Sequence, residues 1–184
     1  MRFLSAIVVL VGLLYLTTAN AAYSQTNEYR DSKDGVSLSL PQNWRAIGPE
    51  SRGDQKGIVV LRDLEMHLEA RLFVQVLTTP VIISAEDMDE RLLRSIKDRI
   101  RYRTKEGYEN YHFRDNSSEL HPINGHSALS WVSEYSDHGH QMVEYLTRVR
   151  SENTNALFFA KVPASQLDDF KRRLDPIIET LEIR

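Results

Sequence analysis

The chain has 184 residues, with 26 acidic and 23 basic side chains, a formal net charge of −3 at pH 7 and no cysteine. A mildly acidic chain lacks the basic footprint that nucleic-acid binding requires, so we expect no nucleic-acid partner. The absence of cysteine excludes disulfides, thiolate metal sites, a cysteine nucleophile and a lipid-modified cysteine anchor.

Residues 1–22 are predicted to be a cleavable signal peptide. Arg2 supplies the charged start, residues 3–16 the apolar segment, and Ala19-Asn20-Ala21 the small residues that signal peptidase reads. The apolar segment is shorter than the roughly 20 residues that a membrane-spanning helix needs, and it has no polar face for an amphipathic anchor. We therefore expect an exported protein, periplasmic or extracellular, with no transmembrane segment after cleavage.

The mature chain is predicted to form one domain. Residues 23–33 are polar and read as a tail, with Glu28-Tyr29-Arg30 as a short edge strand, and residues 34–184 form the domain itself. About 160 residues are enough to bury a core in a single unit.

The stretch from Asp34 to Trp44 gives the clearest indication of the fold. Apolar side chains and serines alternate over Val36–Leu40, which predicts a strand with one buried face and one exposed face. Pro41 cannot donate a ladder hydrogen bond and ends the strand. Trp44 is then expected to lie against the core.

Further strands are predicted along the rest of the chain. Residues 48–57 are rich in glycine and charged residues and are expected to form a loop. Apolar or alternating patterns predict strands over residues 58–61, 70–77, 108–115, 126–136, 140–151 and 156–162. Asn124-Gly125 is the dipeptide most favoured in a two-residue hairpin turn, and Pro122 places the preceding arm at a sheet edge.

Two main helices are expected, over about residues 85–102 and 166–179. A capping box precedes each of them, at Ser84–Asp87 and at Ser165–Asp168. Pro176 lies inside the second apolar pattern and is expected to kink or divide that helix. The predicted order along the chain is strands, a helix, strands and a second helix. This order is typical of an α+β domain whose helices cover an antiparallel sheet.

Three motifs in this order resemble the PsbP/Mog1 superfamily and, within it, the DcrB-like exported proteins. The motifs are the strand from Asp34 to Trp44, the glycine hairpin Ile123–Ala128, and the helix Leu167–Ile178 followed by Leu181–Ile183. The resemblance implies an αβα sandwich around a central antiparallel sheet. It also implies a protein that acts by binding other proteins, with no catalytic residues to carry over.

Histidines near two turns are candidate metal ligands. His138 and His140 flank Gly139 beside Asp137, and two histidines two residues apart on a strand point to the same face, as zinc or copper ligation would need. His121 and His126 could add a ligand if the two hairpins lie close together. The alternative is that Asp, His and Gly occur here for turn geometry alone, with no cofactor.

The end of the first helix is a candidate partner-binding surface. Seven Lys or Arg side chains and only one acidic residue, Asp98, occur between residues 91 and 105. Such a segment could bind an acidic protein partner or an anionic membrane surface. The alternative is a solvated helix face with cations favourably placed near the helix C-terminus. The residues assigned to this candidate surface are Arg91, Arg94, Arg101 and Lys105.

The sequence contains no catalytic motif. It has neither a Gly-x-Ser-x-Gly elbow nor a Ser-x-x-Lys motif. Glu134 and Glu144 could face each other across a hairpin, but carboxylates on an exposed strand face are usually paired, here with Arg148 or Arg150. We therefore expect a non-catalytic, exported protein-binding module. The alternatives are a metal-binding protein that uses the turn histidines, or a hydrolase or small-ligand carrier, which would need a polar pocket between sheet and helix.

Overall fold

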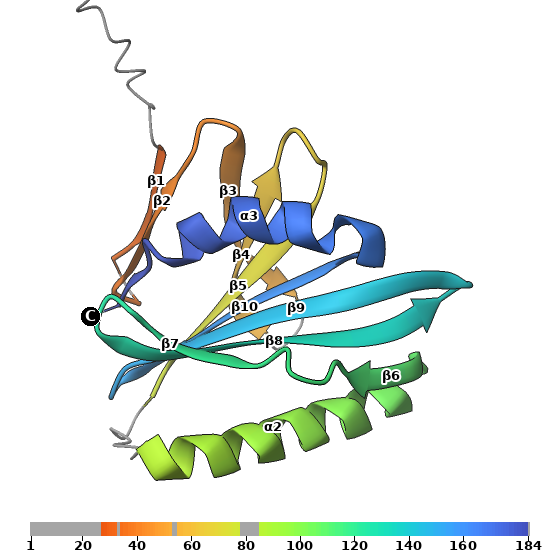
Figure 1. Ribbon diagram of the computed structural model, residues 1–184. Coiled ribbons are helices and arrows are strands. Elements are labelled where there is room, and N and C mark those ends of the chain that lie inside the picture. The colour runs from red at the N-terminus through yellow and green to blue at the C-terminus, as the bar shows by residue number, and fades with distance from the viewer. Residues whose placement is uncertain (1–26, 33, 53–54, 78–84, 184) are drawn as a thin grey trace, which may run out of the picture.

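An antiparallel sheet of eight strands forms the centre of the molecule, and two helices lie against its opposite faces (Figure 1). The computed structural model describes residues 27–32, 34–52, 55–77 and 85–183. Seven strands follow the order β3 (Trp44–Arg52), β4 (Gln55–Asp63), β5 (Glu69–Val76), β10 (Thr154–Pro163), β9 (His140–Arg150), β8 (His126–Asp137) and β6 (Glu109–Phe113). The eighth, β7 (Glu119–Ile123), pairs with β8. The predicted α+β class and αβα sandwich are confirmed.

A second, smaller sheet contains β1 (Asn27–Asp31), β2 (Val36–Leu40) and β11 (Glu182–Ile183). The alternating burial of β2 follows the predicted period of two, with its apolar side chains in the core. Strand β1 pairs with β2 at the edge, as expected for Glu28-Tyr29-Arg30. The pairing of β2 with β11 brings the two ends of the domain together, a long-range contact that sequence patterns do not reveal.

Trp44 lies in the core as predicted, with 1% of its surface exposed. Its ring centroid lies 6.0 Å from that of Phe170 in the C-terminal helix, so the start of β3 is fixed to that helix. The loop prediction over residues 48–57 is wrong, because β3 and β4 form a hairpin across most of this range. Register shifts after Ile47 and after Glu50 show that β3 is irregular. The glycine and the proline of β3 lie within this irregular strand and do not end it.

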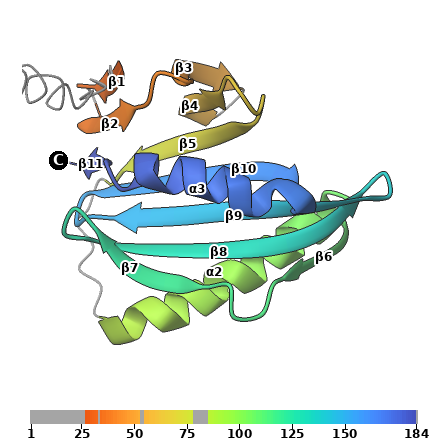
Figure 2. The same ribbon diagram turned by 45° about the horizontal axis from the view of Figure 1, so that its top comes forward.

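Helix α2 (Ala85–Lys105) lies across the sheet on the side away from the C-terminal helix (Figure 2). Ile96 is buried on its inner face and packs in a cluster with Trp131 and Leu129 of β8, together with Leu146 and Phe159. The helix extends one turn beyond the predicted end, and Gly107 with φ 87° follows it. Ser84 of the predicted capping box lies outside the described residues.

The C-terminal helix α3 (Leu167–Ile178) follows the short 3-10 helix η1 (Ala164–Gln166). Its buried side chains are the predicted apolar set, Leu167, Phe170, Leu174, Ile177 and Ile178. The predicted capping box is wrong, because Ser165 lies within η1 and Gln166 at the N-cap makes no side-chain capping bond. Pro176 does not divide the helix, since it occupies the last turn.

Polar contacts near both ends of α3 fix it to the strands. Arg173 binds the buried carboxylate of Asp63 through two nitrogens, and its Nη2 also donates to Glu65 at 2.7 Å. At the far end, Asn124 Nδ2 donates to the carbonyl oxygens of Glu179 and Leu181, at 3.1 and 2.9 Å. The β7–β8 turn therefore does more than reverse the chain, because it also holds the end of α3.

Both predicted hairpin turns are present. Asn124 and Gly125 have φ values of 47° and 81°, and His138 and Gly139 have 49° and 80°. Positive φ at both central residues is the type I′ geometry that suits twisted antiparallel strands. In the described part of the chain, no helix is long and apolar enough to cross a membrane. The predicted signal peptide, residues 1–22, lies outside the described residues.

Candidate functional site

The inner face of α2 contains a buried ionic cluster. Glu144 of β9 has no exposed surface, and its carboxylate lies 2.6 Å from Arg103 Nη2 and 3.3 Å from Arg99 Nη2. Tyr111 of β6 donates its hydroxyl to the same carboxylate at 2.6 Å. Because a buried carboxylate is costly without counter-charges, these contacts fix the helix to the sheet at one rotation about its axis.

Aromatic side chains surround this cluster. The rings of Tyr108 and Tyr135 have centroids 4.9 Å apart, and the Arg103 guanidinium lies 4.8 Å from the Tyr108 centroid. Lys161 Nζ lies over the same ring and contacts its hydroxyl. Burial, with the adjacent charge of Glu144, raises the pKa of Tyr111 to about 12, whereas burial beside Arg103 lowers the pKa of Lys161 to about 8. The carboxylate at the centre of the cluster is thus already compensated by cations of the protein itself.

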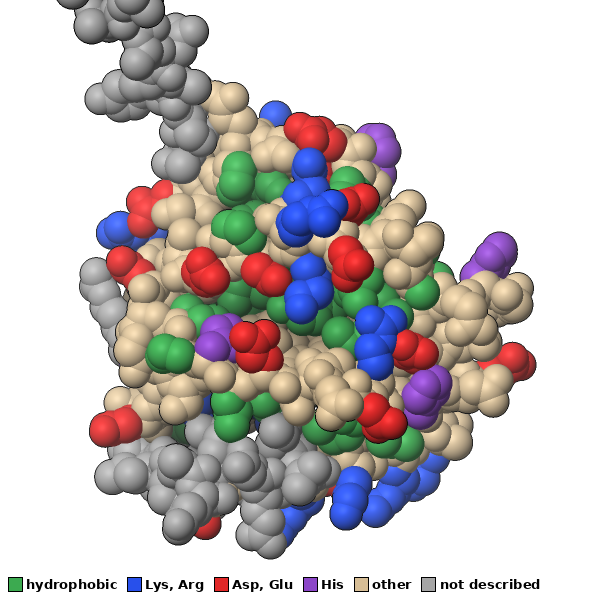
Figure 3. All heavy atoms as spheres, in the orientation of Figure 1, with side chains coloured by type: hydrophobic (Ala, Val, Ile, Leu, Met, Phe, Trp, Pro, Cys, Tyr) green, Lys and Arg blue, Asp and Glu red, His purple; other side chains and the backbone are tan. Residues whose placement is uncertain are grey.

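The outer face of α2 carries a second set of cations. Their spacings of three, four and four residues place them on one side of the helix, and all are exposed. We call them the basic stripe; they are Arg94, Lys97, Arg101 and Lys105. Tyr102, 54% exposed, follows Arg101 in the sequence, and its ring centroid lies 5.9 Å from the guanidinium carbon of Arg103. Lys and Arg side chains gather along the lower right of Figure 3, where Figure 1 places the C-terminal half of α2.

The structure therefore divides the basic segment that the sequence shows as a single run. Arg99 and Arg103 turn inward to Glu144, while the stripe faces solvent. Three predicted partner-binding residues, Arg94, Arg101 and Lys105, lie in the stripe, and the side chain of Arg91 lies outside the described ones. The sequence-based prediction omitted Lys97, although the helical spacing places it on the same face as Arg94 and Arg101.

The two glutamates that could have faced each other lie on opposite faces of the sheet. Glu134 is opposite Val143, and Glu144 is opposite Ser133, so the two carboxylates do not face each other across the hairpin. Glu134 pairs with Arg114 instead. A shift of one residue in register moves every side chain of a strand to the other face, and the sequence did not fix this register.

The candidate metal residues lie at the β8–β9 turn. His138 occupies a turn position with its side chain 96% exposed, and its Nε2 lies 3.7 Å from Asp137 Oδ1. His140 starts β9 opposite Asp137, so the two histidines do not share a strand face as expected. These residues line an open, shallow depression with Met142. Across the described residues, no group of three His, Cys, Asp or Glu converges as a metal site would need.

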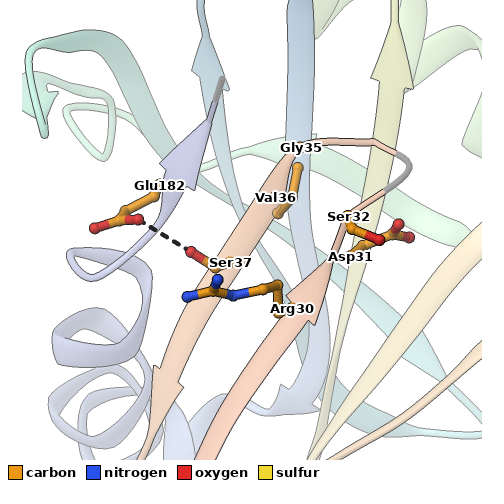
Figure 4. Close-up of a pocket in the computed structure, with 7 residues that line it drawn as sticks. All are labelled: Arg30, Asp31, Ser32, Gly35, Val36, Ser37 and Glu182. Atoms are coloured by element: carbon orange, nitrogen blue, oxygen red, sulfur yellow. Dashed lines mark hydrogen bonds between the residues drawn. The ribbon is translucent and has the colours of Figure 1, made fainter.

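A small cleft of about 140 Å³ lies in the three-stranded sheet (Figure 4). Arg30, Ser37 and Glu182 project into it from three neighbouring strands, and Ser37 Oγ donates to Glu182 at 3.2 Å. Glu28 already binds the Arg30 guanidinium at 2.7 Å. The cleft is therefore a set of exposed, mutually compensated side chains, and we assign it no ligand.

Comparison with known proteins shows what the fold resembles. No known protein family matches the chain, and no curated protein matches it. The solution structure of cyanobacterial PsbP (CyanoP) from Synechocystis is similar, with a TM-score of 0.58 and 15% identity over 90% of this chain and 96% of that one. LpqN of Mycobacterium tuberculosis, described as involved in cell envelope biogenesis, gives a TM-score of 0.52 and 14% identity over 86% and 90% of the two chains.

A crystal structure from Bacteroides thetaiotaomicron is also similar, with a TM-score of 0.55 and 16% identity over 87% of this chain and 49% of that one. At such identities the likeness establishes the fold alone. The fold is thus an α+β fold like that of cyanobacterial PsbP, and membership of the PsbP/Mog1 superfamily stays a prediction. The finer resemblance to DcrB-like proteins stays a prediction.

Proposed function

We propose that the protein is an exported, non-catalytic accessory protein that binds an acidic surface of another protein through the basic stripe. The observation that carries the proposal is the division of cations on α2: two are directed into the sheet, and four are exposed along the outer face, where Arg101 also lies 3.7 Å from Asp98. Arg99 and Arg103 fix the rotation of the helix about its axis, so the helix need not reorient when a partner binds the stripe.

The chemistry of the stripe suits a protein partner. Arginine and tyrosine are the side chains that most often dominate binding energy at interfaces, and Arg101 precedes the exposed Tyr102 in the sequence. Complementary charge mainly raises the association rate and selects the partner. Because the chain as a whole is acidic, a local cationic face would orient the protein so that this face meets an acidic partner.

The predicted leader supports a role outside the cytoplasm. LpqN, a protein of similar fold, is described as involved in cell envelope biogenesis, which fits the same location. The proposal that the protein is not an enzyme rests on the sequence, which has no catalytic motif. Zinc or copper at the β8–β9 turn stays a separate prediction, and it plays no part in this function.

The test compares two variants that lose the same charge. In the first, the four stripe residues Arg94, Lys97, Arg101 and Lys105 are changed to Gln. In the second, four exposed arginines from other surfaces, Arg30, Arg45, Arg62 and Arg172, are changed to Gln. Affinity capture from native envelope and extracellular extracts is performed with the mature chain and both variants over a series of salt concentrations.

We expect a partner that the wild type and the second variant retain and that the stripe variant loses. Retention should also fall as salt rises, because exposed charges are screened over about 8 to 10 Å at moderate ionic strength. Equal retention by both variants would contradict the proposal. Binding to vesicles of phosphatidylglycerol and phosphatidylethanolamine, with no protein retained, would assign the stripe to a membrane surface instead.

A further inference from the structure

The opposite face of the sheet contains a polar cavity of about 410 Å³ between β7, β8, β9 and α3. This volume lies within the range of small-molecule sites in proteins, roughly 300–1,000 Å³. Figure 3 shows acidic side chains, a histidine and a cation together on the face that α3 and β7 share. Its chemistry is separate from that of the basic stripe, which lies on the other side of the sheet.

The lining has an excess of negative charge. Three carboxylates, Glu119, Asp175 and Glu179, line the cavity against one ammonium, that of Lys171. Lys171 Nζ lies 4.9 Å from the centroid of the Tyr145 ring, and it makes no ion pair among the described residues. Glu119 and Glu179 likewise have no ion-pair partner within the described part of the chain. The cavity is therefore suited to a cation rather than an anion.

The deeper part of the cavity contains acceptors that are only partly satisfied. Asp175 is half-buried and accepts one side-chain hydrogen bond, from Tyr145 at 2.7 Å. Burial raises the pKa of Asp175, although the Tyr145 bond and the charge of Lys171 both act in the other direction. His121 also lines the cavity, but its Nδ1 has no exposed surface and does not reach the open space. A half-buried carboxylate with one hydrogen bond can accept further hydrogen bonds from a ligand.

Apolar and hydroxyl groups complete the cavity. Ile123 and Ile178, each 2% exposed, lie beneath the lining, and Ser130 and Thr147 bond to each other at 2.8 Å between their hydroxyl oxygens. An ammonium group donates three hydrogen bonds, which matches the carboxylate acceptors of the cavity. A carboxylate or phosphate ligand would instead meet three negative side chains.

We propose that this cavity binds a primary alkylammonium group, with Asp175 as its main charge partner and the exposed carboxylates of Glu119 and Glu179 adding negative charge. The ammonium belongs either to a free small amine or to a lysine side chain of another protein. Lys171 competes with the ligand for the carboxylates.

The test uses the mature chain and three probes in titration calorimetry. The probes are 1,5-diaminopentane, N-acetyl-lysine N-methylamide, and 1,5-pentanediol as the uncharged control. Binding of the diamine alone assigns a free amine, and binding of the lysine amide assigns a lysine side chain. No binding of either, or equal binding of the diol, overturns the proposal.

Three variants test the residues. Asp175→Asn should weaken binding of the probe at least tenfold, whereas Asp169→Asn, on the exposed side of the same helix, should leave it unchanged. Lys171→Met should tighten binding several-fold, a gain that a misfolded variant could not produce. Wild-type affinity in Asp175→Asn, or no gain in Lys171→Met, would contradict the assignment. None of these results depends on partner capture by the stripe.

Discussion

Glu144 is the residue on which the position of α2 depends most. Its carboxylate has no exposed surface and is compensated by Arg99, Arg103 and Tyr111. We expect Glu144→Gln to lower the free energy of unfolding by about 3 kcal/mol, because it leaves two guanidinium groups without their buried counter-charge. Urea denaturation followed by circular dichroism measures the change.

The matched control is an ion pair on the surface of the same helix. Arg101 lies 3.7 Å from Asp98, and both side chains are mostly exposed. Arg101→Gln is expected to change the free energy of unfolding by less than about 0.5 kcal/mol, because exposed pairs contribute little. A Glu144→Gln variant as stable as this control would show that α2 is not fixed through the buried cluster.

The turn histidines provide a second test at the level of residues. His138 extends into solvent, and His140 lies opposite Asp137 at the start of β9, so the two imidazoles do not share one strand face. We expect zinc and copper titrations to give the same weak isotherm for the wild type and for a His138→Ala, His140→Ala variant. A tight site that the double variant loses would restore the metal-binding hypothesis.

Among the elements, α3 is linked to β4 by an ion pair whose strength depends on pH. Burial opposes ionisation of Asp63, but hydrogen bonds from Arg173 and from the backbone of Glu65 and Met66, together with the charge of Arg173, outweigh it and hold the pKa of Asp63 below its ordinary value. The unfolded chain therefore binds a proton on Asp63 at a higher pH than the folded chain does.

This lowered pKa predicts the direction of a pH dependence. The contribution of Asp63 is fully present above the unfolded pKa, about 4, and is lost as pH falls through the lower folded value. Asp63→Asn should cost about 2 kcal/mol at pH 7, and the difference from wild type should shrink below pH 4. Urea unfolding at several pH values tests this. Arg173→Gln should likewise reduce the fall in the free energy of unfolding between neutral and acidic pH. If that fall were the same as in the wild type for both variants, the assignment would be contradicted.

The elements that the sequence predicted are those whose patterns are local. The serine alternation in β2, the apolar stripe of α3 and Asn124-Gly125 each depend on neighbours within a few residues. The capping box at Ser165 was wrong because Pro163 begins a 3-10 turn first, so the serine does not lie at the helix boundary. The β3–β4 hairpin was missed because β3 is an irregular strand whose composition resembles that of a loop.

At the scale of the whole molecule, both candidate sites depend on contacts between distant segments. The basic stripe could be predicted in outline, because helical spacing alone defines an exposed face. The sequence did not predict which cations turn inward, because that depends on Glu144. The β8–β9 register decides on which face of the sheet Glu144 lies. The cavity beside α3 could not be predicted either, because Asp175 meets Tyr145 and His121 only after the helix packs across the strands.

Because both helices pack on the same sheet, we expect the molecule to unfold as one cooperative unit. Glu144 fixes α2 on one face and Asp63 fixes α3 on the other, and the two clusters have no partner in common. Their substitutions should therefore add within about 0.5 kcal/mol in a Glu144→Gln, Asp63→Asn double variant, provided that unfolding is two-state. Coincident far-ultraviolet and tyrosine-tryptophan signals during urea unfolding check that condition. Separate transitions would show that α2 leaves the sheet before the core around Trp44 and Phe170 unfolds.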